Sequence, residues 1–127
     1  MWMFTQYGFY SVVCGLDLAG HSHGIDPETL MVRARDRRHL ESLQKRFAQL
    51  SSIPIVDTLQ TDYRFRMVVP KQVWVDVSRD LAAEIDYGNF KSRAHSRTHD
   101  DQYVDALHKV WEVMMNLQAS AVRKGKS

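Results

Sequence analysis

The chain has 127 residues and a formal net charge of +2, with 44% hydrophobic and 25% charged residues. This length and composition predict one globular domain with its own hydrophobic core. The one cysteine, Cys14, excludes an intramolecular disulfide and a metal site made of thiolates alone. No apolar run approaches the roughly 20 residues that cross a bilayer, and the start of the chain lacks the pattern of a signal peptide. We therefore expect a cytoplasmic protein with no membrane partner.

The first part of the chain predicts two strands and a helix. Residues 8–14 (GFYSVVC) are aromatic and β-branched, which is typical of a strand. Residues 15–27 are rich in Gly, Asp and His and predict a loop that is long for a compact domain. A second strand is expected over 29–35. Asp36 follows as a helix N-cap, and apolar residues at helical spacing predict a helix over 37–50.

The middle of the chain predicts two more strands and a second helix. Residues 53–59 (IPIVDTL) indicate a strand, and Pro54 favours a place at the edge of a sheet. Residues 63–69 (YRFRMVV) alternate strictly between apolar and other side chains, as a half-buried strand does. Pro70 suits the first turn of a helix, which we expect to continue to about residue 85.

The last part predicts a loop followed by a long helix. Residues 90–99 (FKSRAHSRTH) are polar and basic, and we expect a loop there. Asp100 or Asp101 can cap a C-terminal helix with an apolar face. The final segment, 123–127, predicts a flexible basic tail after a single domain over 1–122.

The order of these elements, β-β-α-β-β-α-α, predicts an α+β fold with a four-stranded antiparallel sheet. Strand, helix, hairpin and helix make up most of a ferredoxin-like unit, and the first strand can fill the place of the missing last strand. The result is a circularly permuted arrangement with spatial strand order one-two-four-three and two helices on one face. The additional C-terminal helix could cross the other face, extend the helical layer or meet a second subunit.

Alternation along the second and fourth predicted strands places basic side chains on one face of the sheet. The arginines of this face are Arg33, Arg35, Arg64 and Arg66. One interpretation is a phosphate-binding surface for RNA or DNA, since guanidinium forks match phosphate geometry. The other is that carboxylates of the last helix, or of a second subunit, pair with them. Arg37, in the first turn of a predicted helix, could likewise contact an anion or remain solvated.

The segment TQYGFYSVV, residues 5–13, resembles in part the aromatic RNP1 strand of RNA-recognition motifs. Tyr7, Gly8 and Phe9 match three central positions, but the basic residue, the first glycine and the last aromatic of that motif are missing. Both faces of the predicted strand are mostly apolar. The rings therefore pack in a core or, as the alternative, Tyr7 and Phe9 assist in stacking on bases.

Four histidines offer a second alternative, a metal-dependent enzyme. His21 and His23 form an H-x-H pair, and His95 and His99 are spaced i, i+4, so convergence of the two segments would gather four imidazoles. Exposed, solvated histidines are the simpler interpretation. The chain holds no nucleotide-binding, zinc-protease or serine-hydrolase motif, so we expect no catalytic residue and no cofactor.

The first alternative to a ligand-binding module is a protein-protein interaction module, homo-oligomeric or inhibitory, in which the C-terminal helix supplies the contact. Its exposed side would include Trp111, Met114 and Met115. Of the three classes, a non-catalytic module that binds nucleic acid or another anionic ligand is the one we favour from the sequence.

Segments spread over most of the chain also resemble a family of small, uncharacterised bacterial proteins. They are MWMFTQYGFYSVV, DPETLMVRAR, DYRFRMVVPKQVW, EIDYGNFKS and ALHKVW. The N-terminal W-x-F-T-x-Y-G-F-Y-S-V-V signature is the most distinctive of them. The resemblance implies no activity and no catalytic residue, and the histidine pairs lie outside these segments.

Overall fold

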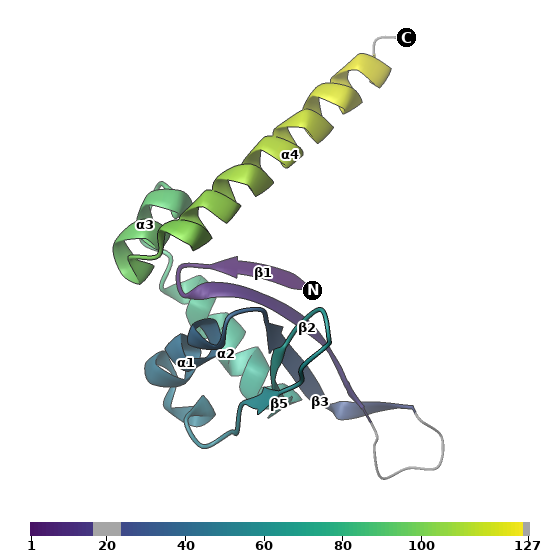
Figure 1. Ribbon diagram of the computed structural model, residues 1–127, viewed down its shortest axis with the longest axis vertical. Coiled ribbons are helices and arrows are strands. Elements are labelled where there is room, and N and C mark those ends of the chain that lie inside the picture. Colours follow the sequence, from purple (N-terminus) through teal and green to yellow (C-terminus); the bar gives the residue numbers. More distant parts are fainter. Residues whose placement is uncertain (17–23, 126–127) are drawn as a thin grey trace. The chain divides into compact units, whose positions relative to one another are not determined.

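The computed structural model describes residues 1–16 and 24–125. Contacts divide the chain into two compact units, Met1–Asp86 and Tyr87–Ser127, and each unit is described by itself. The expectation of a single domain over 1–122 stays a prediction. In Figure 1 the first unit contains the sheet and the helices α1 and α2, and the second contains α3 and α4.

The N-terminal unit combines a sheet with helices, which confirms the α+β class. Its elements are, in chain order, β1 (Trp2–Thr5), β2 (Gly8–Leu16), β3 (Ile25–Ala34), α1 (Arg37–Arg46), a 3-10 turn (Ala48–Leu50), β4 (Val56–Asp57), β5 (Phe65–Pro70) and α2 (Lys71–Ala83). All paired strands are antiparallel, and their spatial order is β1-β2-β3-β5-β4. The four strands expected from the sequence are therefore neighbours in the expected order.

The predicted strand count was wrong, because the described residues form five strands. The additional strand, β1, pairs with β2 through a tight turn. In that turn the Thr5 hydroxyl oxygen accepts the N–H groups of Tyr7 (3.1 Å) and Gly8 (3.2 Å). A four-residue strand is too short for its periodicity to be recognised in a sequence.

Other boundaries also differ from the prediction. The strand expected over 53–59 is limited to β4, and β5 begins two residues later than expected. The first helix ends before Phe47, whose φ of −117° is extended, and not at residue 50. Both ends of the loop expected over 15–27 are strand, because β2 extends to Leu16 and β3 begins at Ile25. Residues 17–23 of that expected loop lie outside the described part of the chain.

Helices α1 and α2 pack on one face of the sheet and form the hydrophobic core with it (Figure 1). The Asp36 side chain caps α1 as predicted, accepting the N–H of Arg38 at 2.9 Å. The core side chains alternate along β2, β3 and β5 and repeat at helical spacing along α1 and α2. The fully buried ones include Tyr10, Val32, Leu40, Leu43, Met67, Val69 and Val77.

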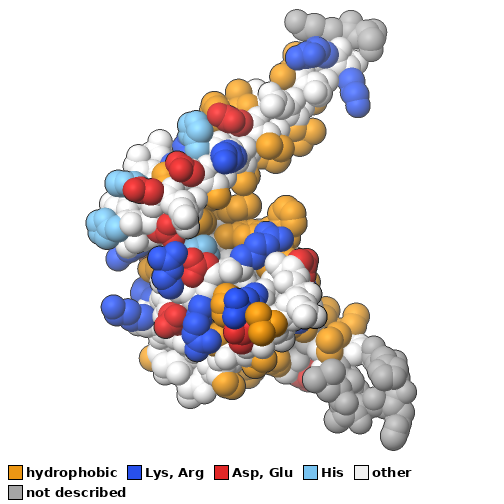
Figure 2. Space-filling model, viewed as in Figure 1, with side chains coloured by type: hydrophobic (Ala, Val, Ile, Leu, Met, Phe, Trp, Pro, Cys, Tyr) orange, Lys and Arg blue, Asp and Glu red, His pale blue; other side chains and the backbone are white. Residues whose placement is uncertain are grey.

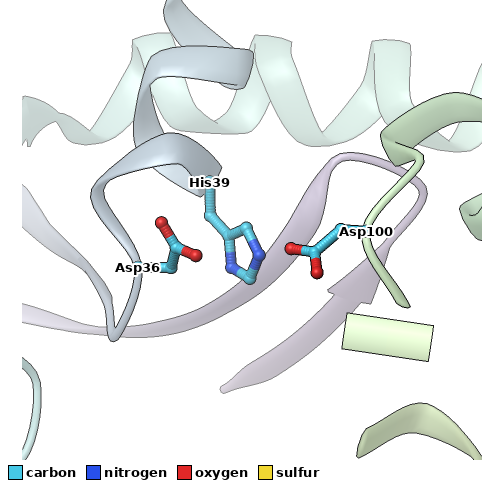
Figure 3. Close-up of side chains that lie close together, drawn as sticks. All are labelled: Asp36, His39 and Asp100. Atoms are coloured by element: carbon cyan, nitrogen blue, oxygen red, sulfur yellow. The ribbon is translucent and has the colours of Figure 1, made fainter. Parts of the chain in front are cut away.

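His39, in the first turn of α1, packs closely against the start of β2 (Figure 3). Its Nδ1 accepts the backbone N–H of Phe9 at 3.3 Å, and its carbonyl accepts the Tyr10 hydroxyl at 2.6 Å. Gly8 has φ +153°, and a Cβ there would overlap the imidazole ring. Glycine at this position therefore allows α1 to approach the hairpin. Asp100, also drawn in Figure 3, belongs to the C-terminal unit.

The C-terminal unit consists of two helices that pack against each other, α3 (Phe90–Thr98) and α4 (Asp101–Gly125). The prediction of a loop over 90–99 was wrong, because α3 occupies most of this segment. The Asn89 side chain caps α3 by accepting the N–H of Ser92 at 2.9 Å. Asp100 caps α4, as one of the two predicted alternatives. The α4 helix includes the first three residues of the expected flexible tail. Among the described residues, no helix has the length and apolarity that a membrane span needs.

Candidate functional site

The face of the sheet opposite α1 and α2 gathers the predicted arginines and several rings, and we call it the arginine face. The sheet register places Ser11, Arg33 and Arg66 side by side across β2, β3 and β5. The side chains assigned to this face by register and contacts are Trp2, Phe4, Phe9, Ser11, Val13, Met31, Arg33, Arg35, Tyr63, Arg66 and Val68. Figure 2 shows basic and hydrophobic side chains next to one another on the visible side of the N-terminal unit.

Tyr63 is the centre of the arginine face. The guanidinium carbon of Arg33 lies 4.5 Å from the centre of the Tyr63 ring, and that of Arg35 lies 4.2 Å from it. Both distances are within the range of a cation–π interaction. The ring itself is buried, with 4% of its surface exposed, so it holds both guanidinium groups in place.

Strict alternation over residues 63–69 predicts that Tyr63 lies with Phe65 and Met67 on the helix-facing side, and this prediction is wrong, because Tyr63 lies on the arginine face. Regular alternation begins only at Phe65, because the chain turns before it. Gln60 has a left-handed φ of 73°. The Thr61 hydroxyl donates to the Thr58 carbonyl, and that of Thr58 donates to the Arg64 carbonyl, each at 2.8 Å. This hydrogen-bonded turn rotates Tyr63 onto the other face.

Arg33 and Arg66 are half-buried and have only neutral partners. Arg33 Nη2 donates to the Ser11 hydroxyl at 2.7 Å. Arg66 Nη2 donates to the Tyr63 carbonyl at 3.1 Å, and its Nη1 lies 3.2 Å from the Met31 sulfur. The Nε of each arginine is buried without a hydrogen-bond partner among the described residues. Buried donors of this kind are unusual, and an acceptor at either group would be stabilising.

Arg35 adds a third cation to this group. Its Nε donates to the Asp62 carbonyl at 3.1 Å, and its guanidinium also lies 6.0 Å from the Phe9 ring. Within the described residues of the N-terminal unit, no carboxylate pairs with Arg33, Arg35 or Arg66.

The other two candidate arginines have acidic partners. Arg64 makes two hydrogen bonds with the Asp57 carboxylate, at 2.8 and 3.0 Å. This contact raises the pKa of Arg64 and lowers the pKa of Asp57. Arg37 lies 3.7 Å from Glu41, four residues along α1. The predicted set of five is therefore reduced to three arginines that gather around one tyrosine.

Three rings at the sheet edge continue the arginine face. Phe4 stacks on Phe9 with ring centres 4.5 Å apart, and Trp2 meets Phe9 edge-on at 5.9 Å. Trp2 is 68% exposed and Phe4 is 37% exposed. Neither residue was singled out from the sequence, although the MWMF start of the chain was the available signal. The short β1 strand brings them beside Phe9.

Tyr7, the other predicted stacking residue, is not available for stacking. It is buried, and its hydroxyl donates to Glu84 Oε1 at 2.7 Å. Glu84 Oε1 also accepts the Gln6 side-chain amide at 3.3 Å, and Glu84 Oε2 accepts two N–H groups of Arg46 at 2.8 and 3.1 Å. Tyr7 thus belongs to a polar cluster that joins the first hairpin to both helices.

The described histidine candidates do not form a metal site. His95 lies within α3, with Nε2 3.6 Å from the Asp101 carboxylate, and His99 ends that helix in a left-handed conformation, with φ 51°. Neither belongs to a group of three potential metal ligands within the described residues. His21 and His23 lie outside the described residues.

The three candidate interface residues all lie on α4 and are exposed. The exposed fractions are 51% for Trp111, 55% for Met114 and 42% for Met115. Trp111 stacks on His108 with ring centres 6.1 Å apart, and the Lys91 ammonium lies 4.9 Å from the Trp111 ring.

Comparisons with known proteins give no match: no family model fits the chain, and no curated protein or solved structure is similar to it. The resemblance to a family of small bacterial proteins stays a prediction, and so does the cytoplasmic location. The functional argument therefore rests on the arginine face and on α4.

Proposed function

We propose that the protein is a non-catalytic binding module that holds single-stranded nucleic acid on the arginine face. The observation that carries this proposal is the group of three arginines around Tyr63, with which no carboxylate pairs among the described residues of the N-terminal unit. Guanidinium groups suit phosphate, and exposed rings suit unpaired bases, which stack on aromatic side chains. Phe4 and Trp2 supply such rings beside the positive charge.

The spacing of these groups favours a strand of nucleic acid over a small anion. Arg33 and Arg66 are directly opposite each other on neighbouring strands, and the aromatic side chains lie on the two strands beyond them. A single phosphate would contact one or two arginines and no ring. A chain of nucleotides can place phosphates on the arginines and a base on Phe4 at the same time.

The sheet itself fits a circularly permuted ferredoxin-like arrangement, which we propose as the finer description of the fold. The order of β2, β3, β5 and β4 and the two helices on one face support it. In this description β2 fills the place of the last strand of the unit, and β1 is an addition at its edge.

A salt titration with fluorescently labelled oligonucleotides, one of DNA and one of RNA, tests the proposal. Three phosphate contacts predict that the logarithm of the association constant falls with the logarithm of salt concentration with a slope of about −2, at roughly 0.7 per contact for single strands. Fluorescence anisotropy measures both the affinity and this slope. Undetectable binding at low salt would exclude the function.

Substitutions identify the surface that binds. Arg33→Gln and Arg66→Gln should each weaken binding several-fold and reduce the slope by about 0.7. The matched control is Arg79→Gln, which removes the same charge from an exposed position on α2. Equal losses in all three variants would show that net charge, and not the arginine face, determines binding.

Removal of a ring tests the contribution of stacking separately. Phe4→Ala should lower affinity by about 1–3 kcal/mol, as the loss of one base-stacking ring does, while the salt slope stays unchanged because no phosphate contact is lost. If Phe4→Ala reduced the salt slope, the variant would have lost a phosphate contact, and this result would contradict the stacking role assigned to Phe4.

A further inference from the structure

Helix α4 carries an apolar surface that the described structure leaves exposed. Its first turns include the buried residues Tyr103 and Leu107, but every residue from 108 to 125 is exposed. The large hydrophobic side chains in this part are Val110, Trp111, Val113, Met114, Met115, Leu117 and Val122, each between 36% and 64% exposed. Figure 2 shows hydrophobic side chains along this helix beyond α3.

The spacing of these side chains is that of a helix-pairing seam. Val110, Met114, Leu117 and Ala121 follow one another at intervals of four, three and four, which is the a/d pattern of coiled coils. Trp111, Val113 and Val122 widen the surface on both sides. The opposite side carries Asp105, Lys109, Glu112, Asn116 and Arg123.

The size of this surface matches what a stable contact needs. With these exposed fractions the seven side chains offer roughly 700 Å² of mostly apolar area, close to the roughly 800 Å² that each partner contributes to a standard interface. Single exposed hydrophobic residues are ordinary, whereas a continuous patch of this size is typical of an interaction site.

We propose that two copies of this chain pair in antiparallel fashion through the second half of α4. A self-complementary seam suits an identical helix, because a two-fold axis presents the same residues from both sides. Charge favours the antiparallel orientation. A parallel pair would bring together two basic ends, each with Arg123 and Lys124, whereas an antiparallel pair sets these ends apart.

The pairing fixes a register. Met114 of one copy packs against Leu117 of the second copy near the two-fold axis, and Val110 packs against Ala121. This interface lies apart from the arginine face in sequence and in composition, and it does not depend on the proposed nucleic-acid binding.

The mass of the full chain in solution, measured by light scattering after gel filtration and without nucleic acid, tests the pairing. We expect twice the chain mass at micromolar concentration. Met114→Lys should raise the dissociation constant at least about a hundredfold, because it places two buried charges at the axis. Asn116→Lys, the same charge change on the opposite side of the helix, is the control and should leave the mass unchanged.

Each outcome decides the proposal. Lysine is a good helix former, so far-ultraviolet circular dichroism should show the same helix content in both variants. A monomeric wild-type chain overturns the proposal. A dimer that survives Met114→Lys, or one that Asn116→Lys dissolves equally, also overturns it, because another surface would then form the contact.

A distance measurement tests the orientation. Spin labels at Gly125→Cys in a Cys14→Ser background should lie about 30 Å apart in the antiparallel register, since 19 residues separate positions 125 and 106 at about 1.5 Å each. A separation near 10 Å would show a parallel pair and refute the orientation.

Discussion

Replacement of Glu84 by alanine should destabilise the N-terminal unit by about 2–3 kcal/mol. The Glu84 carboxylate accepts hydrogen bonds from the Tyr7 hydroxyl, the Gln6 amide and the Arg46 guanidinium. Tyr7 and Gln6 are both almost fully buried. Loss of this shared acceptor costs most of the expected free energy, because both donors are almost fully buried.

The contact between Glu84 and Arg46 contributes less to the free energy that Glu84→Ala removes. Glu84 raises the pKa of Arg46 by hydrogen bonding. The Arg46 side chain is nevertheless 46% exposed, so solvent screens the ion pair and its share falls below about 1 kcal/mol. The hydrogen bonds from the neutral Tyr7 hydroxyl and Gln6 amide therefore account for the larger part of that free energy.

Urea unfolding of six chains, the wild type and five variants, measures how the free energy divides between Tyr7 and Arg46. A double-mutant cycle of Glu84→Ala with Tyr7→Phe should give a coupling energy of about 1–2 kcal/mol, and a cycle with Arg46→Ala a smaller one. If Glu84→Ala changed the free energy of unfolding by less than about 0.5 kcal/mol, the polar cluster would not stabilise the fold. A larger coupling energy between Glu84 and Arg46 than between Glu84 and Tyr7 would show that the ion pair, and not the neutral donors, contributes most.

Three further predictions concern the same unit. Gly8→Ala should lower the unfolding free energy by at least about 2 kcal/mol in urea titrations, because of its φ of +153° and the nearby His39 ring. Asp36→Ala should lower the free energy of unfolding by about 1 kcal/mol, because α1 loses its N-cap. The Arg38 side chain lowers the pKa of Asp36, so the contribution of this ionised carboxylate is present above about pH 4 and is lost in acid; Asp36→Asn should retain the cap and flatten the acid limb of thermal melts. Tyr63→Leu should weaken oligonucleotide binding in anisotropy assays while the chain stays folded, since both arginines lose the ring that orients them.

The sequence predicted those parts of the fold that depend on regular periodicity. Alternation along β2, β3 and β5 and the apolar spacing of α1 and α2 identified the strands, their neighbours and the covered face. The Asp36 and Asp100 caps were also recognisable, since a side-chain oxygen before a helix satisfies N–H groups that the helix leaves unpaired.

Features that depend on a few residues could not be predicted. The β1 strand is four residues long, and the turn that positions Tyr63 depends on one left-handed residue, Gln60. The α3 helix has a polar, basic sequence that is typical of a loop, and its start depends on the side-chain cap of Asn89. In each case a local hydrogen bond, and not a pattern of hydrophobic residues, decides the conformation.

The same contrast explains how the candidate site was only partly found. Four arginines could be assigned to one face by alternation, but which of them have a carboxylate partner depends on tertiary contacts. Arg64 has Asp57 because β4 pairs with β5 at that position, a contact that no spacing in the sequence reveals. Trp2 and Phe4 join the face only through the unpredicted strand.

The arrangement around Tyr63 has a thermodynamic consequence. Arg33 and Arg35 contact the same ring, so two like charges lie close together, and no carboxylate of the described part of their unit pairs with them. Cation–π contacts of about 0.5–2 kcal/mol each hold the groups in place but do not remove their repulsion. An anion at this position would relieve that repulsion. Ligand binding and the stability of the unit are therefore linked, because a ligand that binds only the folded state stabilises it.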